Sequence, residues 1–284
     1  MATPAGLLAQ DGPKLQQALD LDPREARLEV RILLCHALGV ARSWLIGHDR
    51  DALADTEEQT YTALLTRRLA GEPIAYIVGS REFFGLEFKT TPAVLIPRPE
   101  TELLVELALA RISENQPCEV LDLGTGSGAI AISIAKNRPW ATVTAVDRSP
   151  EALAVARENA ARPAVPNLRL LLSDWFGALD AQTYDLIVSN PPYVEDADPH
   201  LLHGDVRFEP LSALASGTDG LDDIRRIAAA APQHLRPGGW LLLEHGYNQG
   251  EGCRAILRRQ GFLDVETIRD LAGLERVSMG LRAA

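Results

Sequence analysis

The chain has 284 residues and a formal net charge of −11, because 39 Asp and Glu residues outnumber 28 Lys and Arg residues. Hydrophobic residues make up 46% of it, enough for a sizeable core, which argues against wholesale disorder. The negative charge argues against binding nucleic acid by neutralising many phosphates. No apolar run approaches the roughly 20 residues of a membrane helix, and three scattered cysteines favour neither disulfides nor zinc. We therefore expect a cytoplasmic protein without metal, membrane contact or direct nucleic-acid partner. We also expect a monomer, although no pattern in the sequence gives the oligomeric state.

The first 75 residues carry a helical pattern. Apolar residues recur at helical spacing over 24–38, and Gly39 stands where a glycine commonly ends a helix. Thr56 to Gln59 fit a capping box ahead of a second amphipathic helix, which Gly71 ends. The sequence thus predicts a small helical domain over residues 1–75, with few apolar residues for a core of its own.

Residues 76–97 have a different character. Tyr76, Ile77 and Phe83 belong to a β-prone stretch, and Gly85 marks a turn. We interpret this stretch as a β-hairpin connector.

From residue 98 to residue 284 the pattern alternates between strands and helices, which is typical of a parallel α/β sheet. The predicted strands are 119–123, 142–146, 168–172, 184–188, 240–244 and 276–281. The predicted helices are 129–136, one that opens at Ser149, 222–234 and one that ends near Gly261. Pro237 to Gly239 predict a turn before the strand at 240–244. In such sheets ligands bind beyond the carboxyl ends of the strands.

A glycine-rich segment, Gly124-Thr125-Gly126-Ser127-Gly128, joins the first of these strands to its helix. Glycines let the backbone turn sharply and let a ligand lie against it. Asp147 ends the next strand, where its carboxylate can accept both hydroxyls of a ribose. We therefore expect an adenosine-containing cofactor.

Asp122, just before the loop, bears on which cofactor this is. The loop also satisfies the dinucleotide pattern G-x-G-x-x-A. An anion at Asp122 would repel a pyrophosphate but suits the cationic amino acid end of S-adenosylmethionine. Asp174 could accept from the adenine amine, and the Trp175 ring could pack on or beside the base. A glycine turn with ordinary strand-end polar residues is the alternative.

The tetrapeptide Asn190-Pro191-Pro192-Tyr193 follows the strand at 184–188. Its prolines fix the backbone and remove two N–H donors. The Asn190 side-chain oxygen and the Pro191 carbonyl remain as acceptors, and Tyr193 supplies a flat face. Two fixed acceptors suit a planar –NH₂ group and would orient its nitrogen toward a methyl donor, so that catalysis is orientation plus electrostatics. A simple turn is the alternative.

At these positions the chain resembles the class I, Rossmann-like amino-methyltransferases, and more specifically the HemK/PrmC family of release-factor glutamine methyltransferases. The stretches that carry the closer resemblance are Gly71–Ile77, Arg81–Gly85, Ile96–Glu102, Phe208–Pro210, Ala213–Leu214 and Asp219–Leu221. The resemblance implies methyl transfer from S-adenosylmethionine to the N5 amide nitrogen of the glutamine in the Gly-Gly-Gln motif of class 1 peptide-chain release factors. It also implies a Rossmann-like methyltransferase domain over 98–284, joined by the hairpin to a helical substrate-recognition domain.

Carried over residue by residue, the family's cofactor contacts fall on the glycine loop, Asp147, Trp175 and Asn190. With Asp174 added, the predicted cofactor-binding residues are Gly124, Thr125, Gly126, Ser127, Gly128, Asp147, Asp174, Trp175 and Asn190. The family's glutamine-binding motif falls on Asn190, Pro191, Pro192 and Tyr193. Of these, Asn190, Pro191 and Tyr193 are the predicted catalytic residues.

Four alternatives stay open. A sister family methylates a glutamine of a ribosomal protein, but it differs in the stretch matching Arg98–Glu102. An enzyme that methylates adenine N6 in nucleic acid would use the same tetrapeptide on a flipped base, and the charge of −11 weighs against it. Asp122 and the tetrapeptide weigh against a nicotinamide-dependent oxidoreductase. An intact Asn190 argues against a non-catalytic binding module.

Two further groups have competing interpretations. Arg98, Glu100 and Glu102 could be a solvated helix start, but the flanking prolines favour a place at the edge of the cleft. His245 follows Glu244 at a strand end beside the cleft, where we expect a structural hydrogen bond and not a catalytic base.

Overall fold

The computed structural model describes residues 2–179 and 181–283. It divides into two compact units. The first comprises the residues up to Ser80 together with Leu202–Phe208, and the second comprises Arg81–Leu201 and the residues from Glu209 onward. Within the described residues, no helix is long and apolar enough to cross a membrane.

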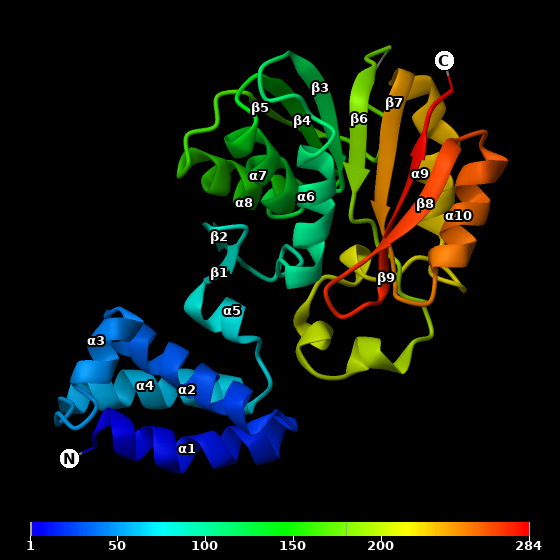
Figure 1. Cartoon of the computed structure of the whole chain (residues 1–284). Helices are drawn as coiled ribbons and strands as arrows, with labels where there is room; N and C mark the ends of the chain where they lie inside the picture. Colours follow the sequence, from blue (N-terminus) through cyan, green and yellow to red (C-terminus); the bar gives the residue numbers. More distant parts are fainter. Residues whose placement is uncertain (1, 180, 284) are drawn as a thin grey trace. The chain divides into compact units, whose positions relative to one another are not determined.

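The first unit is helical, as predicted (Figure 1). Its helices are α1 (Pro4–Leu19), α2 (Pro23–Leu38), α3 (Arg42–Gly47), α4 (Asp55–Leu69) and α5 (Ile74–Val78). Their apolar faces form one core, which includes Leu15, Val30, Leu33, Leu34, Tyr61 and Leu65. Gly39 ends α2 with a φ of 64°, which confirms the predicted helix end.

The predicted capping box at Thr56–Gln59 is wrong by two residues. Helix α4 starts at Asp55, and the Glu57 carboxylate accepts the Ala54 N–H at 2.8 Å. Asp55, Glu57 and Glu58 place three acids in the first turn, where the helix dipole favours them. The acids, and not a threonine hydroxyl, therefore fix where this helix begins.

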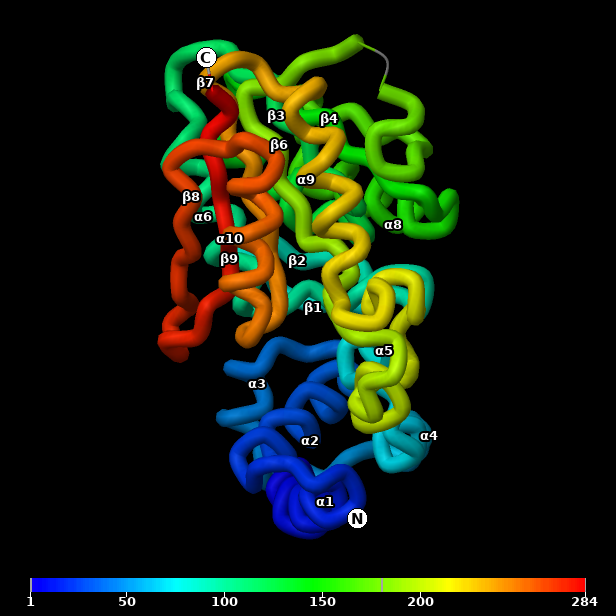
Figure 2. The backbone as a smooth tube through the Cα atoms, turned by 90° about the vertical axis from the view of Figure 1, so that its right-hand side faces the viewer, coloured from blue at the N-terminus to red at the C-terminus, as the bar shows by residue number. Residues whose placement is uncertain are grey.

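The segment Leu202–Phe208 packs on the helical unit, although it follows the Asn-Pro-Pro-Tyr tetrapeptide in the chain. Arg68 of α4 donates to Glu29 of α2 at 2.7 Å and to Asp205 at 2.8 Å. Arg207 donates to the carbonyl of Ala70 at 2.9 Å. Figure 2 shows this yellow-green segment beside α4.

The predicted hairpin is shorter than residues 76–97. Its strands are β1 (Ser80–Phe83) and β2 (Leu86–Lys89). Tyr76 and Ile77, predicted as extended, lie buried in helix α5. A short apolar run does not by itself distinguish a strand from a buried helical turn, and Pro73 at the N-cap of α5 is compatible with helix entry.

The second unit contains a seven-stranded sheet in the order β5-β4-β3-β6-β7-β9-β8. The strands are β3 (Cys118–Leu123), β4 (Ala141–Asp147), β5 (Leu168–Leu172), β6 (Tyr184–Ser189), β7 (Leu235–Glu244), β8 (Leu263–Arg269) and β9 (Glu275–Leu281). The five strands from β5 to β7 are parallel, and β9 runs antiparallel to both of its neighbours. The chain leaves β3 toward β4 and later returns to its other side at β6, so a topological switch point lies at β3.

Helices cover both faces of this sheet. Helices α6 (Glu102–Leu109), α7 (Ala129–Asn137) and α8 (Pro150–Ala161) lie on one face, and α9 (Asp222–His234) and α10 (Gly250–Arg259) on the other (Figure 1). Figure 2 shows α9 and α10 next to each other. Each face has its own apolar core, built around Ile132 of α7 and around Ile227 of α9. The predicted Rossmann-like α/β architecture is confirmed.

Two features of the sheet differ from expectation. Strand β8 was not predicted, although residues 263–266 alternate between apolar and polar as a strand does; it is largely exposed at the sheet edge. The turn predicted at Pro237–Gly239 lies instead within β7, where the pairing register shifts between Tyr184 and Leu186 of β6. The glycines bulge there, and Gly238 and Gly239 exchange hydrogen bonds with Arg282.

Candidate active site

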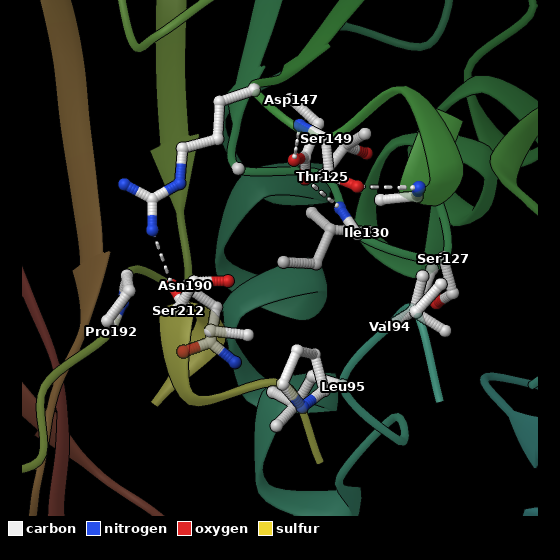
Figure 3. Close-up of a pocket in the computed structure, with 18 of the residues that line it drawn as sticks. Val94, Leu95, Thr125, Ser127, Ile130, Asp147, Ser149, Asn190, Pro192 and Ser212 are labelled. Carbon is white, nitrogen blue, oxygen red and sulfur yellow. Dashed lines mark hydrogen bonds between the residues drawn. The ribbon is translucent and has the colours of Figure 1, made fainter. Parts of the chain in front are cut away.

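A cavity of about 280 Å³ lies beyond the carboxyl ends of the parallel strands, where the fold class places its ligands. Segments far apart in the sequence line it. They include Ala93–Leu95, the loop from Gly124 to Ser127, Asp147–Ser149, Ser173–Trp175, Asn190 with Pro192, and Ser212–Ala213. Figure 3 shows Val94, Ser127, Ile130, Asn190 and Pro192 around this space.

The glycine loop turns at the end of β3. The N–H groups of Gly124 and Thr125 both donate to the carbonyl of Val146 at 2.9 Å, which holds the loop against β4. Gly128 has a φ of 85°, and a Cβ there would stand 2.7 Å from Ile132 Cδ1. Gly128 does not line the cavity, whereas Gly124, Thr125, Gly126 and Ser127 do. Glycine at this position leaves room for the Ile132 side chain, and the cofactor contact predicted for Gly128 stays a prediction.

Asp122 does not line the cavity, so its predicted partnership with the cationic end of a cofactor is not supported. Its carboxyl is fully buried and accepts from the Thr125 hydroxyl at 2.6 Å. Burial raises the pKa of Asp122 to about 7, and the nearby charge of Asp147 adds to the shift. Through this hydrogen bond to Thr125, Asp122 stabilises the glycine loop.

Asp147 lies at the cavity, at the end of β4. One carboxylate oxygen accepts the Gly126 N–H at 2.8 Å, and the other accepts the Ser149 N–H at 2.9 Å. A carboxylate has about four acceptor sites, so both oxygens can still receive a hydroxyl. The two hydrogen bonds from backbone N–H groups fix the orientation of the Asp147 carboxylate.

Asp174 and Trp175 follow β5 and also line the cavity. Asp174 is mostly exposed and forms an ion pair with Arg226 at 3.1 Å. Trp175 has a positive φ of 49°, and its indole N–H donates to Asp223 at 3.2 Å. A Cβ on Gly124 would stand 3.2 Å from the indole ring, so glycine at position 124 lets the ring lie against the loop.

Asn190 follows β6 directly and lines the cavity. Its side-chain nitrogen donates to the hydroxyl of Thr101 at 3.2 Å. Its side-chain oxygen is buried and has no hydrogen-bond partner within the part of the chain that the structure describes. A buried carbonyl oxygen without a partner costs free energy, so it is a candidate acceptor for a substrate N–H.

The rest of the tetrapeptide is fixed by its surroundings. Pro192 lines the cavity, but Pro191 and Tyr193 do not. The Tyr193 N–H donates to the carbonyl of Leu214 at 3.0 Å, and its carbonyl accepts from Gln249 at 2.9 Å. Its hydroxyl points to Glu244 at 3.4 Å, and burial raises the pKa of this tyrosine. Tyr193 therefore does not line the cavity, and the substrate-binding and catalytic role predicted for it stays a prediction.

Two residues after Pro97, Arg98 and Thr101, line the cavity. The sequence indicated a place at the cleft for the first of them only. Arg98 lies at the cavity, as favoured, and pairs with the buried carboxylate of Glu209 at 2.7 Å. Thr101 was not singled out, since no motif marked its hydroxyl as the partner of Asn190. Glu100 and Glu102 do not line the cavity, and Glu102 accepts from the Phe84 N–H at 2.8 Å.

His245 makes the structural hydrogen bonds expected of it. Its ring nitrogens lie 2.8 Å from the Ser278 hydroxyl and 2.8 Å from the Gly246 carbonyl. Burial lowers its pKa. No cluster of three or more His, Cys, Asp or Glu side chains that could hold a metal ion occurs among the described residues.

The fold and the site define a Rossmann-like methyltransferase. Residues 99–204 match the Methyltransferase small domain family, and residues 15–79 match the PrmC N-terminal domain family. A solved methyltransferase from Pyrococcus furiosus shares the fold, with a TM-score of 0.55 and 21% identity over 78% of this chain and 100% of that one.

Two curated relatives are more similar in sequence. The release factor glutamine methyltransferase of Salmonella typhimurium is 51% identical over 91% of this chain and 93% of its own length. That of Burkholderia pseudomallei is 54% identical over 93% and 94%. The chain belongs to the release factor glutamine methyltransferase family.

Proposed function

We propose that this chain transfers a methyl group from S-adenosylmethionine to the side-chain amide nitrogen of the glutamine in the Gly-Gly-Gln motif of class 1 release factors. The observation that carries the proposal is the buried, unpartnered side-chain oxygen of Asn190 at the cavity. A primary amide N–H is the kind of donor that this oxygen lacks.

The cavity suits the proposed cofactor by the chemistry of its lining. Asp147 and Asp174 offer carboxylate acceptors for ribose hydroxyls and for an amine. Val94, Ile130 and Ala152 offer apolar surface for a base. When bound, S-adenosylmethionine supplies a methyl group made electrophilic by a positively charged sulfur.

The chain's own contribution to the reaction is orientation. An amide nitrogen is a poor nucleophile, because its lone pair is delocalised into the carbonyl. Asn190 Oδ1 would accept one N–H bond of the glutamine at the cavity, and the Pro191 carbonyl, which lies outside the cavity lining, is the second acceptor that the motif predicts. With both N–H bonds accepted, the remaining lone pair is directed toward the methyl group. Prolines at 191 and 192 make these acceptors rigid, so little reorganisation accompanies transfer. The new N–C bond would form as the methyl–sulfur bond breaks with its electron pair left on sulfur, and the nitrogen would then release its extra proton to water.

The identity of the substrate rests on the family. We infer that the helical unit recognises the release factor and that the chain acts in the cytoplasm as a monomer, without binding nucleic acid directly. The net charge of −11 supports a protein substrate over a polyanion. The second candidate is adenine N6 in nucleic acid, because an exocyclic amine would also satisfy Asn190.

Methyl transfer from labelled S-adenosylmethionine tests this function. The acceptors are a purified class 1 release factor, the same factor with Gly-Gly-Gln changed to Gly-Gly-Ala, ribosomal protein, and DNA and RNA. Label on the intact release factor alone supports the proposal. Label that survives the change to alanine, or that appears on nucleic acid instead, refutes it.

A further inference from the structure

The prolines stiffen the tetrapeptide, but they do not by themselves fix where it lies. A proline ring fixes φ and leaves ψ free, and without an N–H group it cannot be anchored by donating a hydrogen bond. The first residue after Asn190 that carries a backbone N–H is Tyr193. Its N–H donates to the carbonyl of Leu214 at 3.0 Å, and its carbonyl accepts from the side chain of Gln249 at 2.9 Å. The course of the tetrapeptide therefore depends on these two contacts.

Gln249 stands just before helix α10 and uses both ends of its side-chain amide. Its Nε2 donates to the carbonyls of Tyr193 at 2.9 Å and Asp219 at 3.2 Å. Its Oε1 accepts the Gly246 N–H at 2.8 Å. The three bonds agree on one orientation, because turning the amide over would set its oxygen against two carbonyl oxygens. One side chain thus joins the loop after β6, the loop before α9 and the turn after β7.

Gly220 leaves the space that this arrangement needs. It is buried and has a φ of 69°. A Cβ at this position would clash with the Tyr193 carbonyl oxygen and would stand 2.7 Å from Gln249 Nε2. Gly220 is the middle residue of Asp219–Leu221, one of the stretches that carry the family resemblance, and none of its three residues lines the cavity. The close approach to Tyr193 gives this stretch a physical role.

We propose that Gln249 is a positioning residue, which holds the tetrapeptide at Tyr193 so that its acceptors keep their places toward the substrate amide. Gly220 provides the room for this contact. This inference rests on the proposed function, in which the tetrapeptide receives the glutamine amide. Gln249 does not line the cavity, so it acts through the backbone of the tetrapeptide. Its loss should therefore change kcat more than cofactor binding.

Gln249→Glu in the full chain separates the contacts of this side chain. Glutamate keeps the oxygen that accepts the Gly246 N–H, but an ionised carboxylate has no N–H for the carbonyls of Tyr193 and Asp219. We expect kcat to fall about tenfold to a hundredfold, as small displacements of reacting groups do, with the KM for S-adenosylmethionine within about twofold. Unchanged kcat would show that Gln249 only holds the turn after β7, which would overturn the inference.

Asn167→Asp is the matched control. Asn167 is likewise half-buried, and its side-chain amide donates to the backbone carbonyls of Ala135 at 3.1 Å and Ala141 at 2.9 Å. It stands just before β5, at the opposite edge of the sheet from the cavity. The same change from amide to acid should lower the melting temperature and leave kcat unchanged. An equal loss of kcat in Gln249→Glu and Asn167→Asp would overturn the inference.

Gly220→Ala tests the same contact from the other side, and it carries the test if Gln249→Glu does not fold. Its control is Gly261→Ala, because Gly261 also has a positive φ, of 82°, but a Cβ there meets nothing within 4 Å. Both variants strain the backbone, and only the first displaces the Tyr193 carbonyl. We expect kcat to fall in Gly220→Ala alone. Equal kcat in the two alanine variants would contradict the inference.

Hydrogen exchange without release factor separates this inference from the proposed function. The N–H groups of Tyr193 and Val194 both donate to the carbonyl of Leu214, at 3.0 and 2.8 Å. Both should exchange faster in Gln249→Glu than in the wild type, whereas the Thr125 N–H should be unchanged. Faster exchange, together with no methylation of the release factor by the wild type, would reject the function and keep the positioning. Equal exchange rates in the two proteins would reject the positioning.

Discussion

Asp147 at the end of β4 accepts the backbone N–H of Gly126, at the centre of the glycine loop, at 2.8 Å. The carboxylate thus does two things: it fixes the loop, and it presents its remaining acceptor sites to the cavity. We therefore expect loop shape and cofactor affinity to be coupled through this side chain.

Asp147→Ala should weaken S-adenosylmethionine binding about tenfold to a hundredfold, the loss expected for hydrogen bonds to a charged group. Titration calorimetry measures this directly. Asp185→Ala is a suitable control, because Asp185 also accepts a backbone N–H, from Glu119 at 2.8 Å, but does not line the cavity. Unchanged affinity in Asp147→Ala would contradict the ribose assignment.

Asn190→Ala removes the unpartnered oxygen and should lower kcat by about a hundredfold to a thousandfold, the usual effect of losing one preorganised polar group at a reacting centre. Cofactor affinity should stay within a few-fold, because most of the cavity lining is unchanged. Calorimetry and a methyl-transfer assay on the same preparation distinguish the two effects. An equal loss in both would mean that Asn190 acts through the cofactor site.

The sequence located those parts of the site that lie in one continuous motif. The glycine loop and the tetrapeptide each follow a buried strand, and parallel strands bring their carboxyl ends to one edge of the sheet. The sequence alone therefore places Asn190 beside the loop.

Residues whose role depends on packing between distant segments were missed. Thr101 meets Asn190, and Glu209 meets Arg98, only because separate loops close over the same edge. Asp122 shows the converse case: its position in the chain suggested a place at the cavity, but its side chain is fully buried and does not line it. Periodicity and motif spacing carry no information on such contacts.

The buried carboxyl of Asp122 should leave a signature in the pH dependence of stability. Its pKa in the folded chain, about 7, lies above the ordinary aspartate value. The folded state therefore binds more protons than the unfolded state between about pH 4 and pH 7, so this group lowers the free energy of unfolding as the pH rises through that window. Urea denaturation of the wild type and of Asp122→Asn should show a smaller decline in the variant. Parallel curves for the two proteins would contradict the burial of a titrating carboxyl.

Arg68 should be among the most sensitive positions of the helical unit. It is 2% exposed and bonds Glu29, itself 5% exposed, as well as Asp205. Arg68→Leu leaves the Glu29 carboxylate buried without its partner, which costs about 3–5 kcal/mol. Arg67→Leu is the matched control, because Arg67 pairs with Glu72 on the surface, where such pairs are worth about 0–1 kcal/mol.

The double variant Arg68→Leu with Glu29→Leu should regain much of the loss, since it removes both buried charges. Urea unfolding of the four proteins measures this, and a loss below about 1 kcal/mol in Arg68→Leu would show that the ion pair does not hold the unit together.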